Sequence, residues 1–156
     1  MSSMASRSNE AYVDTSALIA LCDRSDTYHA LFRRLFSEPP ALLTTALVVT
    51  EGHAWFLRRF DAARGLRFLA MIEEMKPLRT LSVGPREQAA GIEILRRFPD
   101  QRLTLADAVG LHAMEARKIA SCWSTDHHLG LTGVPLIIHS GRAVHDRRVR
   151  ARGSGK

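Results

Sequence analysis

Four acidic side chains differ from the others because no lysine or arginine lies within four positions of them. They are Asp14, Glu51, Asp107 and Asp126, out of 16 acidic residues in the chain. With 22 basic residues in 156, several such acids are expected by chance, so the missing neighbours alone do not indicate a site. Their positions are more informative, because Asp14 and Asp126 each follow a short apolar run.

The other two acids lie on predicted helices, among mostly apolar residues. The neighbours three and four positions away are Leu47, Val48, Ala54 and Trp55 for Glu51, and Leu103, Thr104, Gly110 and Leu111 for Asp107. Residues at these spacings share one side of a helix, so we expect both carboxylates to point inward. Both also lie near the predicted start of a helix, where the helix dipole stabilises negative charge.

Acidic side chains that are brought together need a cation or bound protons. Two like charges about 4 Å apart repel by about 1 to 4 kcal/mol, depending on the surrounding dielectric. A ligand set made only of oxygen atoms favours a hard ion, Mg²⁺ or Mn²⁺. No cysteine or histidine cluster competes in the sequence. His127 and His128 lack a third histidine at ligand spacing, and we interpret them as loop residues.

Helix capping is the structural alternative for three of the four acids. Asp14 and Asp126 could cap the segments that follow them, and Asp107 forms a loose capping box with Thr104. Glu51 could instead be a solvated residue at the rim of its helix. Because capping does not explain a glutamate on an apolar face, we prefer the interpretation of a shared site.

Short apolar runs alternate with helical stretches along the chain. Residues 11–13, 42–44, 78–83, 121–124 and 135–138 are predicted strands, and residues 16–23, 27–36, 46–60, 62–75, 86–97 and 105–119 are predicted helices. Strands separated by helices indicate an α/β fold with a short, mostly parallel sheet and helices on both faces. Sites in such folds lie beyond the carboxyl ends of the strands, where Asp14 and Asp126 are expected.

The length of 156 residues is typical of one domain with its own core. Cys22 and Cys122 have apolar neighbours and no C-x-x-C spacing, so we expect two reduced core residues. The polar first ten residues do not resemble a signal peptide, and no apolar run approaches the roughly 20 residues needed to cross a bilayer. We therefore expect a cytoplasmic protein without membrane association.

The net charge of +6 is concentrated at the C-terminus. Residues 141–156 contain six basic residues and one acidic residue, so the rest of the chain is nearly neutral. We expect a folded domain over residues 10–140 and a flexible basic tail over residues 141–156. The tail could bind nucleic acid, or it could only increase solubility.

Four segments carry a family resemblance. They read YVDTSALIAL, LTTALVVTEGHAWF, FPDQRLTLADAVGLHAMEARKIA and SCWSTDHHLG. In this order they resemble the PIN-domain ribonucleases, especially the VapC-type toxins of bacterial toxin–antitoxin pairs, and the likeness extends over residues 12–138. One difference is Leu129, at a position where the family often has an aromatic residue. The resemblance implies a PIN-like three-layer sandwich for residues 10–140.

The resemblance also implies a catalytic site. The acids with which the family holds one or two divalent ions, Mg²⁺ or Mn²⁺, fall on Asp14, Glu51, Asp107 and Asp126. The first three would form the main metal cradle, and the fourth would complete it or orient the attacking water. Ser16 and Thr125 would hydrogen-bond a carboxylate or a water molecule beside the ion. The implied activity is that of a metal-dependent endoribonuclease, which hydrolyses RNA phosphodiester bonds.

Partners are implied in the same way. VapC-type toxins are held inactive by an antitoxin protein and commonly form homodimers. The pairs Trp55–Phe56 and Phe32–Phe36 could line a groove for the antitoxin, or they could be core residues. Candidates for binding RNA phosphates are Arg58, Arg59 and Arg102.

Two other classes of function compete with the nuclease. A catalytically inactive PIN-like module would bind nucleic acid or protein, but the presence of all four acids argues against it. A receiver-type signalling domain also holds Mg²⁺ at strand ends. It needs paired acids beside the first strand and a lysine after the last one, and the sequence does not provide them.

Overall fold

The structure, a computed structural model, describes residues 8–140, and the expected basic tail lies outside these residues. The strands are β1 (Ser8–Val13), β2 (Leu42–Thr45), β3 (Leu78–Leu81) and β4 (Ile119–Trp123). The helices are α1 (Thr15–Cys22), α2 (His29–Leu35), α3 (Ala46–Arg59), α4 (Ala62–Glu74), α5 (Pro85–Arg97), α6 (Leu105–Arg117) and the 3₁₀ helix η1 (His127–Gly130).

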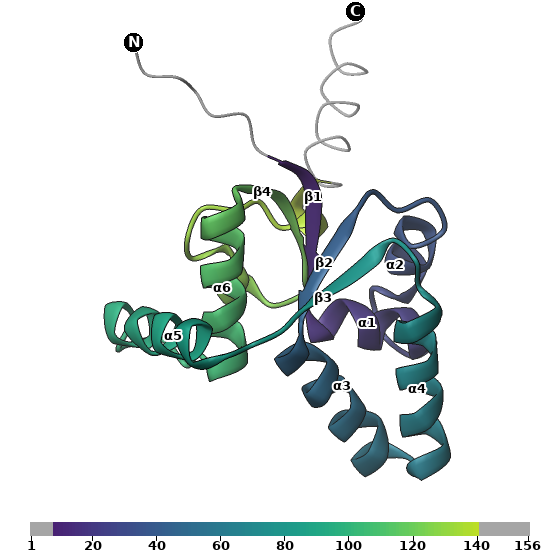
Figure 1. Cartoon of the computed structure of the whole chain (residues 1–156). Helices are drawn as coiled ribbons and strands as arrows, with labels where there is room; N and C mark the ends of the chain where they lie inside the picture. Colours follow the sequence, from purple (N-terminus) through teal and green to yellow (C-terminus); the bar gives the residue numbers. More distant parts are fainter. Residues whose placement is uncertain (1–7, 141–156) are drawn as a thin grey trace, which may run out of the picture.

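All four strands are parallel and form one sheet in the order β3-β2-β1-β4. Parallel neighbours need a crossover connection, and helices provide each crossover here. Helices α5 and α6 lie on one side of the sheet and α1 to α4 on the other (Figure 1). The predicted α/β fold, with a short parallel sheet and helices on both faces, is therefore confirmed.

The parallel arrangement brings the carboxyl ends of the strands to one edge of the sheet. Tyr12 in β1 is in register with Leu43 in β2 and with Cys122 in β4. The residues that follow these strands are consequently neighbours in space, although more than a hundred positions separate β1 from β4 in the sequence. This edge positions the candidate site.

Aromatic rings fill much of the core beside the sheet. Phe32 is fully buried, with its ring centroid 6.5 Å from that of Trp123, and Phe36 packs edge-on against the same tryptophan at 5.0 Å. Phe56 is also buried and stacks on Phe68 with centroids 5.1 Å apart. Phe32 and Phe56 are thus core residues, and Phe56 and Phe68 also border a pocket of about 250 Å³ beside α4.

The predicted strand at residues 135–138 is wrong. Leu136 forms a single parallel bridge with Cys122, and residues 137–140 are helical. The backbone N–H of Cys122 donates to the carbonyl of Pro135 at 2.9 Å, but the pairing ends when the chain turns into the helix. A short apolar run is compatible with either structure, so its composition could not decide between them.

The two cysteines differ in exposure, which corrects the expectation that both belong to the core. Cys122 is buried in β4, whereas Cys22 is exposed at the end of α1, and both are free thiols. The thiol of Cys22 lies 3.4 Å from the sulfur of Met71 on α4. In the part of the chain that the structure describes, no helix has the length and apolar character needed to span a membrane.

Glycine at position 110 allows α6 to pack closely against the central strand. A Cβ atom there would lie only 2.5 Å from the hydroxyl oxygen of Tyr12. Tyr12 is fully buried in β1, so its ring has no open space into which it can move. Gly110 therefore fixes the distance between the sheet and the helix that carries Asp107.

Replacing Gly110 with alanine should destabilise the protein by roughly 1 to 3 kcal/mol, the usual effect of overpacking a core. Helix propensity predicts the opposite sign, because alanine is the better helix former by about 1 kcal/mol. Gly130→Ala is the matched control, since the nearest atom to its Cβ would be 3.7 Å away. Urea denaturation followed by circular dichroism measures both, and an unchanged or higher stability of Gly110→Ala would contradict the packing argument.

Candidate metal centre

Asp14 is the most buried of the four acids, with 7% of its surface exposed. It follows β1 directly, and its backbone N–H donates to the carbonyl of Trp123 at 3.0 Å, which ties it to the end of β4. It occupies the N-cap position of α1, yet its side chain makes no capping hydrogen bond. The carboxylate is therefore available for another role.

Two serine hydroxyls hold this carboxylate in place. Ser16 and Ser124 both donate to Oδ2 of Asp14, each at 2.9 Å. The same two hydroxyls accept backbone N–H groups, Ser16 from Thr125 and Ser124 from Asp126, each at 3.0 Å. The start of α1 and the segment after β4 are thereby joined into one hydrogen-bonded network around Asp14.

The hydroxyl after β4 that donates a hydrogen bond to Asp14 belongs to Ser124, whereas the sequence predicted such a role for Thr125. Thr125 contributes its backbone N–H to the network, and the hydroxyl that reaches Asp14 belongs to Ser124, which is fully buried. A catalytic role for Thr125 stays a prediction. Two adjacent hydroxyl residues follow β4 in the sequence, and only the direction in which the strand ends decides which of them points inward.

Glu51 and Asp107 reach the same edge from α3 and α6. Glu51 is exposed, which corrects the expectation that it points into the core, because its part of α3 borders a pocket that is open to solvent. Asp107 forms a capping box with Thr104: its Oδ2 accepts the Thr104 backbone N–H at 3.1 Å, and its own backbone N–H donates to the Thr104 hydroxyl. Capping and a place at the site are thus compatible for Asp107.

The four acids meet in one pocket of about 390 Å³. Its lining consists of Asp14, Thr15, Ser16, Ile19, Glu51, Arg102, Thr104, Asp107, Asp126 and His128. Within residues 8–140, none of the four carboxylates forms an ion pair with a lysine or arginine. The pocket therefore concentrates four carboxylates against a single arginine, Arg102, with which none of them is paired.

Burial first, and then the neighbouring acids, raise the pKa values of the carboxyl groups in the pocket. Burial raises the pKa of Asp14, hydrogen bonds from the two serines oppose the change, and the charge of Asp107 adds to it. Desolvation also raises the pKa of Glu51, although this residue is exposed on one side, and each of the other three acids raises it further. The pKa of Asp107 is raised by desolvation and by Asp126, against the lowering effect of its bonds to Thr104.

The donor set fits a hard divalent cation. Carboxylate and hydroxyl oxygens dominate the lining, and such ligands favour Mg²⁺ or Mn²⁺ over softer metals. A cation would relieve the mutual repulsion that raises the carboxyl pKa values. His127 and His128 begin η1 rather than lying in a loop, and their potential ligand atoms and that of Asp126 lie within 4.8 Å of one another.

Only one of the three arginine candidates lies at this site. Arg102 is in the pocket lining, whereas Arg58 and Arg59 are exposed in the last turn of α3 and are not part of it. Across residues 8–140, Arg102 makes no ion pair with an acidic side chain. Its guanidinium is therefore free to meet an anion that enters the pocket.

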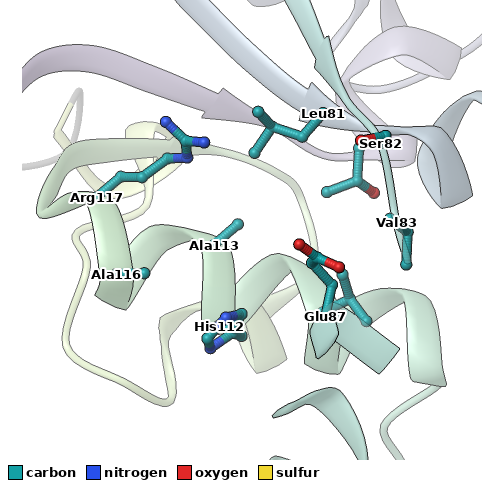
Figure 2. Close-up of a pocket in the computed structure, with 10 residues that line it drawn as sticks. Leu81, Ser82, Val83, Glu87, His112, Ala113, Ala116 and Arg117 are labelled. Carbon is teal, nitrogen blue, oxygen red and sulfur yellow. The ribbon is translucent and has the colours of Figure 1, made fainter. Parts of the chain in front are cut away.

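Another cavity, of about 200 Å³, lies between the β3–α5 connection and α6. Figure 2 shows Leu81, Ser82 and Val83 on one side of it and His112, Ala113 and Ala116 on the other. Glu87 also lines it, but its carboxylate accepts the backbone N–H of Gly84 at 2.9 Å and so caps α5. None of the four clustered acids reaches this cavity, so we place the candidate site at the acidic pocket.

The raised carboxyl pKa values predict how pH affects stability without metal. A carboxyl group whose pKa is higher in the folded state binds its proton more tightly there, so stability is lost as pH rises from about 4 through the folded-state pKa. Without metal, Asp14→Asn should therefore melt at a higher temperature than the wild type at pH 7, with the difference vanishing near pH 4. Thermal melts in EDTA measure this, and a wild type as stable as the variant at pH 7 would contradict it.

Comparison with known proteins identifies the family of this fold. The PIN domain family model matches residues 11–133. No curated protein matches the chain significantly in sequence.

Solved structures with a similar fold include the Mycobacterium tuberculosis toxin VapC20, described as cleaving the sarcin–ricin loop. It is 23% identical, with a TM-score of 0.73 over 80% of this chain and 95% of that one. PAE2754 from Pyrobaculum aerophilum is 19% identical, with a TM-score of 0.62 over 86% and 93% of the two chains. A toxin–antitoxin complex from Klebsiella pneumoniae is 17% identical, with a TM-score of 0.55 over 80% and 92%. Since the family model spans the sheet, the helices around it and all four acids, this protein belongs to the PIN-domain family.

Proposed function

We propose that this protein is a metal-dependent endoribonuclease and the toxin of a type II toxin–antitoxin pair. The observation that carries the proposal is the pocket where four carboxylates, none paired with a lysine or arginine of residues 8–140, converge at the carboxyl edge of a PIN-family sheet. The similarity in fold to VapC20, a toxin that cleaves RNA, supports the same class of substrate for this chain.

We assign each of these residues a role in the proposed reaction. Asp14, Glu51 and Asp107 would hold Mg²⁺ or Mn²⁺, and Asp126 would complete the set of ligands or orient the attacking water. When bound, the ion lowers the pKa of a water molecule and neutralises charge on the phosphate oxygens. Ser16 and Ser124 keep Asp14 in position, because both donate to the same carboxylate oxygen.

Arg102 provides the local positive charge that the substrate needs. The body of the protein is nearly neutral, so long-range attraction of RNA by the folded domain is weak. An arginine beside four carboxylates attracts a phosphate group to the edge of the pocket, where its planar guanidinium can donate two parallel hydrogen bonds. We assign Arg102 to a phosphate next to the cleaved bond.

An antitoxin and a second copy of the chain are the proposed protein partners. The toxin–antitoxin complex among the similar folds supports the first of them. Leu57, Phe60 and Leu66 are large apolar residues exposed at the end of the α3–α4 hairpin, with 45%, 45% and 64% of their surfaces accessible. Arg64 lies over the ring of Phe60, so this surface suits an apolar segment with acidic flanks.

The two competing functions fare differently. Membership of the PIN family leaves no support for a receiver-type signalling domain. A catalytically inactive PIN-like module retains the same fold and is distinguished from the nuclease only by an assay of RNA cleavage.

Asp14→Asn should leave the fold intact and reduce the rate of RNA cleavage by more than about a hundredfold. Removing a residue that only hydrogen-bonds a metal ligand already costs about 10- to 100-fold, and removing the ligand itself should cost more. Cleavage of a structured RNA in Mn²⁺, with and without EDTA, measures this, and circular dichroism checks the fold. Glu73→Gln, which changes an exposed acid on α4, is the control and should cleave like the wild type. A wild-type rate for Asp14→Asn would refute the site, and a wild type that does not cleave the RNA in Mn²⁺ would favour the binding module.

Arg102→Gln should weaken RNA binding and reduce the dependence of log Kd on log salt by about one unit, as expected for one lost phosphate contact. Fluorescence anisotropy with a labelled RNA measures both quantities, in the Asp14→Asn background so that the RNA stays intact. Arg86→Gln, an exposed arginine at the start of α5, is the control and should change neither. An unchanged salt dependence for Arg102→Gln would exclude the phosphate contact.

A further inference from the structure

His128 makes two contacts with one oxygen of Asp126. Its backbone N–H donates to Oδ1 of Asp126 at 3.0 Å, and its ring nitrogen Nδ1 lies 2.7 Å from the same oxygen. A carboxylate can only accept a hydrogen bond, so Nδ1 must carry the proton in this pair. Oδ1 is thus held from two directions, and Oδ2 is the oxygen outside this pair.

The pair is anchored on both sides. The backbone N–H of Asp126 donates to Ser124, whose hydroxyl reaches Asp14, so the main chain at Asp126 belongs to the network around the most buried acid. The ring of His128 stacks on that of His127 with centroids 4.3 Å apart, and Leu129, the next residue, is fully buried. The imidazole therefore meets Asp126 from a fixed direction.

His128 also borders the acidic pocket itself. It is part of the same lining as the four acids. Ligands of metal ions are commonly held by such outer hydrogen bonds, which fix their orientation.

We propose that His128 is a positioning residue for the metal centre: its Nδ1–H holds Oδ1 of Asp126 so that Oδ2 is directed at the cation. This inference rests on the proposed function, because it assigns Asp126 to the ion. It goes further in assigning a specific task to a histidine whose sequence position alone gave no reason to include it.

Helix capping and metal positioning make different predictions for the imidazole. The backbone N–H of His128 supplies the capping bond and survives any substitution of the side chain. If the ring served only η1, its loss would change stability and leave the affinity for metal unaffected. If the ring positions Asp126, its loss weakens metal binding, and a side chain with a donor in the same place restores it.

The test compares His128→Leu with His128→Asn. The amide nitrogen of asparagine lies close to where Nδ1 lies in histidine and can donate the same hydrogen bond, whereas leucine cannot. Mn²⁺ binding, measured from the electron paramagnetic resonance signal of the free ion, should weaken by about 10- to 100-fold in His128→Leu. It should stay within about threefold of the wild type in His128→Asn, because the donor is retained.

The controls separate this proposal from its alternatives. Glu73→Gln, which changes an exposed acid on α4 outside the pocket lining, should bind Mn²⁺ like the wild type, and His128→Ala repeats the test without the bulk of leucine. Wild-type affinity in both His128→Leu and His128→Ala would overturn the proposal. So would an asparagine variant as weak as the leucine one, since the donor at Nδ1 would then not be the group that matters.

The Asp14→Asn variant distinguishes failure of the metal centre from failure of the positioning role. If it loses Mn²⁺ binding while His128→Leu does not, the metal centre stands and the positioning role is refuted. If the wild type binds no Mn²⁺, the proposed function fails and the role of His128 fails with it.

Discussion

Mutual repulsion among four carboxylates in one pocket is the constraint on which the rest of this arrangement depends. Each acid comes from a different part of the chain, and each would lower its energy by moving away from the others. The scaffold prevents this because parallel strands end at a common edge, and the helices that follow cannot leave the sheet without exposing their apolar faces. Folding thus concentrates negative charge in one pocket, and a bound cation would neutralise it.

The hydrogen bonds around Asp14 show how a buried carboxylate is tolerated. Two hydroxyls donate to one of its oxygens and so replace part of the hydration that burial removes. They do not compensate fully, because the pKa of Asp14 remains above its ordinary value. The first turn of α1 meanwhile lacks a side-chain cap. The buried carboxylate and the uncapped start of α1 both reduce the stability of the fold. Functional sites in proteins commonly have such a cost.

Much of the fold and part of the site could be predicted from the sequence. The alternation of apolar runs and helical stretches gave four of the strands and the parallel sheet, since neither depends on fine detail. The strand-end rule then placed Asp14 and Asp126 at one edge. The run at residues 135–138 could not be assigned by composition, because an apolar segment of that length fits a strand or a helix equally well.

The details that sequence reasoning missed depend on direction rather than on residue type. Ser124 and Thr125 are adjacent hydroxyl residues, and their side chains point in different directions. The backbone conformation after β4 therefore decides which of them contacts Asp14. His128 depends likewise on the turn that follows Asp126. The inward direction expected for Glu51 was wrong for a similar reason, because helical spacing defines a face but not whether protein or solvent lies opposite it.

The capping box of α6 gives one carboxylate two functions at once. Oδ2 of Asp107 holds the backbone N–H of Thr104, and the same side chain lines the acidic pocket. An ion or ligand in that pocket would therefore lie beside the first turn of α6. The other side of α6 packs closely against α5, where a Cβ on Gly91 would lie 2.7 Å from Val109. The first turn of α6 therefore lies between the acidic pocket and the packing of α6 against α5, and filling the pocket should change how tightly that turn is held.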